Sequence, residues 1–193
     1  MHYYPLDYKP EEANPSEQYL NYAQVHKDAI QILLKEYLEH PPMHDYSLAP
    51  ILSLLRQYIE LQLKGIIMYR EHTPEPIVSH DIIWLYEKAR KTIEEMYGSS
   101  ELGPSNGDVV RFISSLGKFD PKAQAFRYPT HKDGKDFFSE SERMDTWLHE
   151  RIISLPLLSD IAEKIIDDLE GIEGYLALKK ENEEEELGNA EYF

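Results

Sequence analysis

The chain has 193 residues, the length of one domain, and its 41% hydrophobic content is enough for a packed core, which excludes a wholly disordered chain. It carries 36 acidic against 20 basic side chains, a formal net charge of -16, and such a surface repels nucleic-acid backbones except where cations gather locally. The absence of cysteine excludes disulfides, thiolate metal sites and a cysteine nucleophile.

The sequence predicts neither a membrane span nor an export signal. No apolar run approaches the roughly 18 residues that cross a bilayer. The first five residues, Met1 to Pro5, are neither basic nor apolar, unlike a secretory signal. We therefore expect a cytoplasmic protein that does not contact membranes.

The first part of the chain predicts two long helices. Asn14 is a capping residue and Pro15 suits the first helical position, and apolar side chains then recur at helical spacing until Pro41 ends the pattern. The second helix runs from Ser47 toward Arg70 and is apolar on most sides, which is typical of a helix in the middle of a bundle.

The rest of the chain continues the helical pattern with one interruption. Helices are predicted near 79–98, over 109–116, around 139–154 and from about 156 onward. The last of them carries the most regular apolar stripe in the chain, formed by Leu158, Ile161, Ile165, Leu169, Ile172 and Leu176. Turn residues and aromatic residues over 118–140 indicate a short irregular or hairpin-like insert.

These patterns predict an all-α fold, a single helical bundle of four to six helices. The whole chain, 1–193, is expected to be one helical domain with a core over about 14–180. Residues 181–193 hold acidic residues and no basic ones, so we expect them to form a solvated, frayed tail.

Ser79, His80 and Asp81 have the composition of a hydrolytic triad but not its geometry. They are consecutive, whereas the imidazole of a triad must bond the nucleophile on one side and the carboxylate on the other. The three residues are better explained as a cap of the helix that follows them.

His40, His44 and Asp45 come nearest to a metal-binding set. Their spacing is not helical, and the two imidazoles with the adjacent carboxylate have no further strong ligand beside them. The chain also lacks a glycine-rich phosphate loop and a dinucleotide fingerprint. We therefore expect no metal and no cofactor.

The insert contains one strip with chemistry suited to a phosphodiester. Arg127 offers a planar fork for phosphate oxygens, and His131 can move a proton to or from a ribose hydroxyl. The alternative is structural, with Arg127 paired to a carboxylate or to helix carbonyls. In an extended strip the rings of Phe126 and Tyr128 lie on one side and Arg127 on the other, so we expect both rings to hold the strip against the bundle.

Three segments of the chain form an ordered set. They are Glu60-Leu61-Gln62-Leu63-Lys64, then Ser79-His80-Asp81-Ile82 with Leu85, and finally Asp120-Pro121 followed by Phe126-Arg127-Tyr128-Pro129. Together they resemble the HEPN superfamily of prokaryotic helical domains. The resemblance covers about residues 20–178, and the Phe-Arg-Tyr-Pro strip is its most specific part.

The resemblance implies a bundle of four or five helices, often an antiparallel homodimer. Many members act in toxin–antitoxin, abortive-infection or other phage-defence systems. The active ones are metal-independent endoribonucleases with an arginine followed, after four to six residues, by a histidine, and two such pairs face each other across the dimer cleft. Other members lack this motif and serve as binding or assembly modules.

This sequence departs from the active pattern. Only three residues separate Arg127 from His131, and Tyr128 stands where active members commonly carry a polar residue. Arg143 and His149 have the right spacing, but one such match is expected by chance in a chain with this many arginines and histidines. Arg127 and His131 are therefore the candidate catalytic residues that the resemblance implies.

Three functions remain open. The first is a HEPN-like binding or regulatory module in a prokaryotic defence or toxin–antitoxin setting, with a degenerate RNase site and with RNA, an antitoxin or a nucleotidyltransferase as expected partners. The second is a metal-independent endoribonuclease that uses Arg127 and His131 across a homodimer cleft. The third is a helical scaffold with no RNA or small-molecule site.

Overall fold

The computed structural model describes residues 14–42, 48–71, 77–97, 107–128 and 145–190, with side chains for all of them except 70–71, 96–97 and 179–190. These residues form no strand, and their helices are α1 (Pro15–Glu39), α2 (Ala49–Glu71), α3 (Ile82–Tyr97), α4 (Gly107–Phe119), α5 (Thr146–Ile153) and α6 (Leu155–Ala190). The predicted all-α helical bundle is confirmed for this part of the chain. None of the described helices is both long enough and apolar enough to cross a bilayer.

Helix α1 begins and ends where its sequence predicts. The side-chain oxygen of Asn14 accepts a hydrogen bond from Ser16 N at 3.1 Å, and Pro15 occupies the first turn, where no amide hydrogen is needed. The helix ends at Glu39, because the two prolines that follow His40 cannot continue it.

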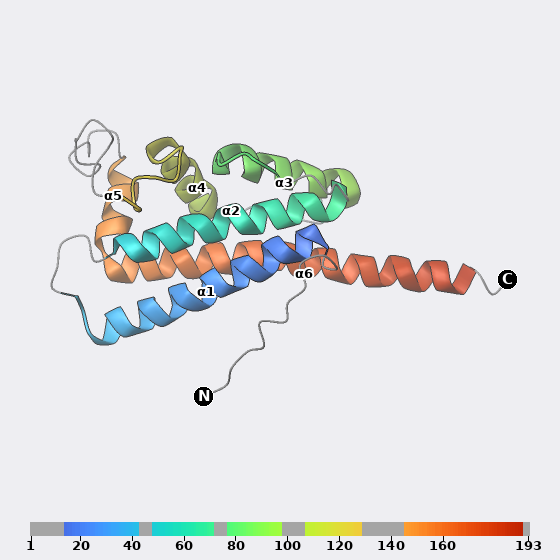
Figure 1. Ribbon diagram of the computed structural model, residues 1–193, viewed down its shortest axis with the longest axis horizontal. Helices are drawn as coiled ribbons and strands as arrows, with labels where there is room; N and C mark the ends of the chain where they lie inside the picture. Colours follow the sequence, from blue (N-terminus) through green and yellow to red (C-terminus); the bar gives the residue numbers. More distant parts are fainter. Residues whose placement is uncertain (1–13, 43–47, 72–76, 98–106, 129–144, 191–193) are drawn as a thin grey trace.

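Helix α2 is the centre of the bundle. It contacts α1, α3 and α6, and Figure 1 shows α1, α2 and α6 side by side along the long axis, with α5 at one end. Its buried apolar side chains point to more than one neighbour, which agrees with the prediction of a helix surrounded by others. They are Ile51, Leu52, Leu55, Tyr58, Ile59, Leu63, Ile66, Ile67 and Met68.

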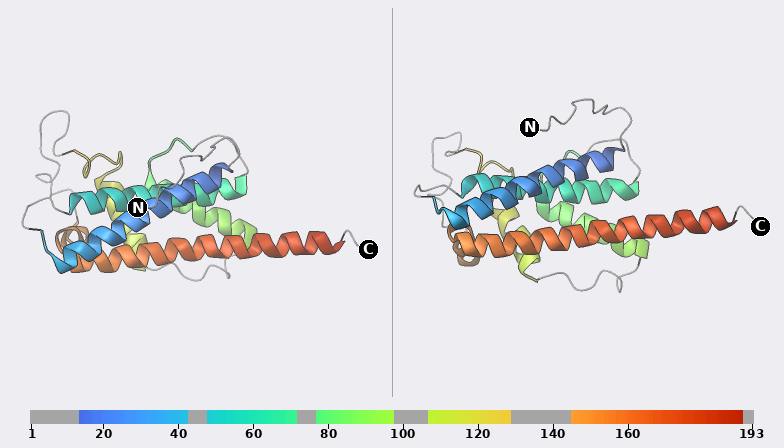
Figure 2. Two further views of the ribbon diagram at one scale, coloured as in Figure 1. Left: turned by 60° about the horizontal axis from the view of Figure 1, so that its bottom comes forward. Right: turned by 90° about the horizontal axis from the view of Figure 1, so that it is seen from below.

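Helix α6 supplies the stripe that packs against this centre. All six stripe residues predicted from the sequence are buried, and α6 contacts α2, α1 and α4. Residues 181–190, where the sequence predicts a solvated, frayed tail, continue the helix. Glutamate, leucine and alanine favour helix in this segment and no proline interrupts it, although Gly188 and two asparagines disfavour helix. Figures 1 and 2 show this end of α6 running past the other helices.

The insert is irregular where the structure describes it. Residues 120–128 form turns after α4 and contain no strand, while 129–140 lie outside the described residues. Helix α5 begins at Thr146, where the carboxylate of Asp145 accepts a hydrogen bond from Leu148 N at 2.9 Å. The predicted start of this helix near 139 also lies outside the described residues.

Gly117 and Gly171 offer a matched pair of glycine-to-alanine substitutions within helices. A Cβ at Gly117 would meet Ile83 Cγ1 at 2.6 Å, whereas one at Gly171 would meet nothing within 4 Å. Alanine gains about 1 kcal/mol of helix propensity at either site, but over-packing costs about 1–3 kcal/mol. We expect Gly171→Ala to raise the midpoint of urea unfolding and Gly117→Ala to lower it. Equal shifts of the two midpoints would show that Ile83 of α3 can move away from a methyl group at position 117 without strain.

Candidate functional site

A line of charged residues runs through the apolar middle of α2. Arg56, Glu60 and Lys64 are spaced four residues apart, so they share one face, and all three are buried. One carboxylate oxygen of Glu60 lies 3.2 Å from Arg56 Nη1, and the other lies 2.9 Å from Lys64 Nζ. Buried charges are tolerated when they are paired and hydrogen-bonded, and all three side chains of this line are ion-paired, although Arg56 Nε has no hydrogen-bond partner among the described residues.

The two cations keep Glu60 ionised. Burial by itself would raise the pKa of Glu60, but the hydrogen bond and charge of Lys64, the charge of Arg56 and the hydrogen bond from His80 outweigh it, so the pKa lies below its ordinary value. Burial lowers the pKa of Arg56, and the charge of Glu60 opposes that change. The guanidinium starts from so high a pKa that it stays protonated.

The segment before α3 places a histidine on this line. Asp81 caps α3 by accepting hydrogen bonds from two amides of its first turn, at 3.0 and 3.1 Å, which confirms the predicted cap. Arg56 Nη2 donates to the His80 carbonyl at 2.5 Å and so ties the segment to α2. His80 Nδ1 lies 2.8 Å from Glu60 Oε1, although the side chain of His80 is 65% exposed.

The turn after α4 is built to present Arg127. The buried carboxylate of Asp120 accepts a hydrogen bond from Gln124 N at 2.7 Å. Ala123 adopts a left-handed φ of 54°, which tightens the turn. The Gln124 carbonyl then accepts a hydrogen bond from Arg127 N at 3.1 Å. The buried carboxylate of Asp120 thus fixes Gln124, and the Gln124 carbonyl in turn fixes the backbone of Arg127.

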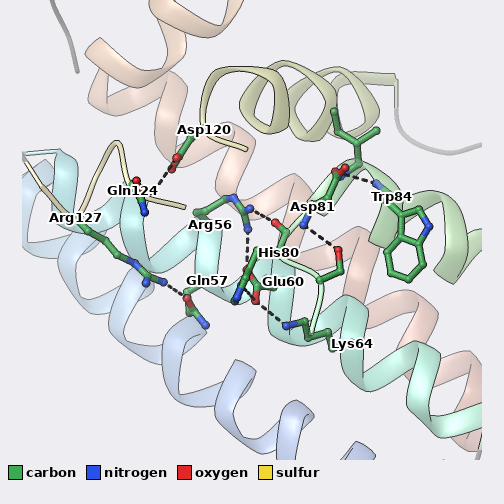
Figure 3. Close-up of polar contacts among 12 residues, drawn as sticks. Arg56, Gln57, Glu60, Lys64, His80, Asp81, Trp84, Asp120, Gln124 and Arg127 are labelled. Carbon is green, nitrogen blue, oxygen red and sulfur yellow. Dashed lines mark hydrogen bonds and ion pairs between the residues drawn. The ribbon is translucent and has the colours of Figure 1, made fainter. Parts of the chain in front are cut away.

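Arg127 reaches the same face of α2 as His80. Its guanidinium donates to the side-chain oxygen of Gln57 and remains exposed. Gln57 precedes Glu60 by three residues, so the groups that contact Arg127 and His80 are neighbours on one helix face. Figure 3 shows the two contacts following one another along α2.

This face is locally more positive than the chain as a whole. The charges of Asp120 and Arg127 both act on Arg56, so they lie close to the charged line of α2. Arg56, Lys64 and Arg127 therefore equal in number the carboxylates of Glu60, Asp81 and Asp120, in a chain whose formal net charge is -16. An anion can approach such a face in spite of the overall charge.

The prediction for the aromatic strip is half right. Phe126 is 7% exposed and packs against Phe119, with ring centroids 5.9 Å apart. Tyr128 is 60% exposed, so the prediction that both rings hold the strip is wrong. Tyr128 N donates to the Gln124 carbonyl at 3.2 Å, which makes the strip a turn in which the alternation of an extended strand does not apply.

Two of the three other predicted site residues lie outside the described residues. His131, the second candidate catalytic residue, lies outside the described residues, and so does Arg143. His149 is exposed on α5. Of the expected pair Arg127 and His131, the structure therefore places only the arginine.

The metal candidates are only partly described. His44 and Asp45 lie outside the described residues, and His40 lies 3.3 Å from Glu36, both on the surface. Among the residues that the structure describes, no group of three or more histidine, aspartate or glutamate side chains could hold a metal ion.

Helical periodicity alone does not single out Arg56 or Gln57, and it assigns His80 only to a cap. A local signal for the charged line is nevertheless present, because charges spaced four apart in a helix that is apolar on most sides must pair with each other. The contacts of His80 and Arg127 have no such signal, since they join segments far apart in the sequence.

No protein-family model matches the chain, and no curated protein or solved structure matches it either. Function is therefore inferred from the chemistry of this face and from the sequence resemblance.

Removing the charge of Glu60 should destabilise the fold strongly. Glu60→Gln keeps the shape of the side chain but leaves Arg56 and Lys64 buried without a counter-charge, which costs about 3–5 kcal/mol. Glu87→Gln, at an exposed glutamate of α3, should change the free energy of unfolding by less than about 0.5 kcal/mol. Urea unfolding followed by circular dichroism measures both, and similar losses in the two variants would contradict the prediction.

The lowered pKa of Glu60 predicts a loss of stability in acid. Because this pKa is lower in the folded than in the unfolded chain, unfolding takes up a proton. The stabilisation is fully present above the unfolded value of about 4.3 and is lost as the pH falls through the folded value. Urea melts at a series of pH values should therefore show a steeper acid loss in the wild type than in Glu60→Gln. Parallel curves would argue against this role of Glu60.

Proposed function

We propose that the chain is a HEPN-like helical module that binds RNA and serves as a binding or regulatory component of a prokaryotic defence or toxin–antitoxin system. The observation that carries the proposal is the convergence of the three segments on which the resemblance rests. Glu60 and Lys64 of the first segment, His80 of the second and Arg127 of the third meet along one face of α2. Segments so distant in the sequence form one set only through folding, which supports a shared role.

The chemistry of Arg127 favours a phosphate as the ligand. Its guanidinium is exposed and is bonded to a neutral amide, so no carboxylate of the described chain neutralises it. Guanidinium groups bind phosphate oxygens through two parallel hydrogen bonds. Tyr128, next along the turn, exposes an aromatic ring, and single-stranded RNA binds proteins by stacking its bases on such rings.

The second candidate is a metal-independent endoribonuclease that uses Arg127 and His131 across a homodimer cleft. Burial of Arg127 against helix carbonyls would argue against this function, and the exposure of its side chain favours it instead. For both candidate functions we propose that the chain forms a homodimer and that its partner protein is an antitoxin or a nucleotidyltransferase.

A scaffold without an RNA site fits the structure less well. Replacing a buried ion pair by well-packed apolar residues is often neutral or stabilising. The line of Arg56, Glu60 and Lys64 therefore adds little to the stability of a pure scaffold. In a binding face, the same line would hold the polar groups in a fixed orientation.

The experiment that tests the proposal is RNA binding by the wild type and two single variants. Arg127→Gln removes the guanidinium that is proposed to bind phosphate. Lys122→Gln removes an exposed positive charge from the same series of turns, so both variants have the same net charge. A hydrogen bond to a charged group contributes about 1.5–3 kcal/mol. We expect Arg127→Gln to weaken binding of a fluorescent single-stranded RNA about tenfold or more, and Lys122→Gln less than about twofold. Fluorescence anisotropy at several salt concentrations measures both.

Two controls make the result specific. Arg127→Gln should unfold at nearly the same urea concentration as the wild type, because the side chain is exposed. It should also reduce the salt dependence of binding by about one phosphate contact. Absence of RNA binding by the wild type, or equal binding by the two variants, would show that the proposal is wrong.

A further inference from the structure

His80 and Glu60 form an imidazole–carboxylate pair that is buried on one side and open on the other. Nδ1 of the imidazole lies 2.8 Å from the carboxylate, which is almost fully buried, while most of the imidazole side chain is exposed. The carboxylate cannot rotate away, because Arg56 and Lys64 hold it as well. A histidine oriented by a fixed carboxylate is prepared for proton transfer.

The ionised state of Glu60 decides which ring nitrogen carries the proton. A carboxylate can only accept hydrogen bonds, so Nδ1 of His80 must be the donor. In the neutral imidazole the lone pair is then on Nε2, which has no hydrogen-bond partner among the described residues. Nε2 can therefore accept a proton from a bound molecule.

Two other histidines of the described chain lack this arrangement. His26 Nδ1 lies 2.8 Å from the Tyr22 carbonyl, an uncharged backbone group. His40 lies 3.3 Å from Glu36, but their side chains are 73% and 62% exposed, so solvent screens the pair. The buried carboxylate partner distinguishes His80 from both.

The α2 residues that contact His80 and Arg127 are neighbours on one helix face. Gln57 contacts Arg127 and Glu60 contacts His80, and residues three apart on a helix have Cβ atoms about 5–6 Å apart. Figure 3 shows Gln57, Glu60 and Lys64 in succession along the helix beneath the two groups. A phosphodiester bound by Arg127 would thus bring its ribose close to the imidazole.

We propose that His80 is the general base of a metal-independent RNA cleavage at this face, with Glu60 as the residue that positions it. The inference rests on the proposed RNA binding at Arg127, and it gives to His80 the proton transfer that the resemblance implies for His131. Nε2 takes the proton of a ribose 2′-hydroxyl while that oxygen forms a bond to phosphorus.

Water completes the transfer of protons in this step. As the new bond forms, the bond from phosphorus to the 5′ oxygen breaks, and this oxygen takes a proton from water. The imidazolium of His80 then returns its proton to water. The products are a 2′,3′-cyclic phosphate and a 5′-hydroxyl, and the guanidinium of Arg127 stabilises the charge on the phosphate oxygens during the exchange.

The test is cleavage of single-stranded RNA in the presence of EDTA by the wild type, His80→Ala and His149→Ala. General base catalysis contributes about 10²–10⁴-fold, so at saturating RNA, where affinity no longer affects the rate, His80→Ala should cleave about 100-fold more slowly or worse. His149→Ala, which removes an exposed histidine of α5, should keep the wild-type rate. Added imidazole should restore part of the rate of His80→Ala, a result that a merely structural role would not produce.

Two further measurements concern the chemistry and the positioning. The wild-type product should end in a 2′,3′-cyclic phosphate, and DNA of the same sequence should stay intact because it lacks the attacking hydroxyl. Nitrogen NMR of labelled histidine in the wild type should find the proton of neutral His80 on Nδ1. A proton on Nε2 would overturn the positioning by Glu60, and this readout does not depend on a Glu60 variant that folds.

The outcomes separate this inference from the proposed function. RNA binding without cleavage by the wild type, or cleavage that His80→Ala leaves unchanged, would overturn His80 as the general base and leave RNA binding at Arg127 standing. Absence of RNA binding would overturn both.

Discussion

The burial of one carboxylate is the constraint on which the functional face depends. Glu60 lies inside the bundle and accepts hydrogen bonds from Lys64, Arg56 and His80. Arg56 and Lys64 belong to α2 like Glu60 itself, whereas His80 comes from the segment before α3, and Arg56 also bonds the backbone carbonyl of His80 and so ties that segment to α2. An isolated charge in the interior is very costly, so these contacts form as one unit and are lost as one unit.

The position of α2 explains how such a unit is tolerated. A helix packed between α1, α3 and α6 has no solvent face long enough for three charges, so they must neutralise one another internally. Their spacing of four residues makes this pairing possible within a single helix. The apolar neighbours then hold the charged side chains in place. The exposed side chains of His80 and Arg127 are positioned in turn by their contacts with Glu60 and Gln57.

An acidic chain can still present a site for an anion when some of its cationic side chains are paired with carboxylates and others are not. Lys27 is bonded to Glu170, and Lys164 is bonded to Asp108 and Asp160, so these charges serve the links between helices or within one. Arg127 is bonded to an amide and keeps its charge for a ligand. The local arrangement, and not the net charge, therefore decides what this face attracts.

The sequence by itself determined the local features, because backbone hydrogen bonds and an apolar period are set by neighbouring residues. The cap at Asp81, the pairing of Glu60 with Lys64 and the buried stripe of α6 are of this kind. Local signals were insufficient for the exposure of Tyr128, which depends on a turn rather than on alternation. Only the tertiary structure decided that segments 20 and 70 residues apart would meet over α2. The packing of α2 against its neighbours selects those meetings, and no period in the sequence encodes them.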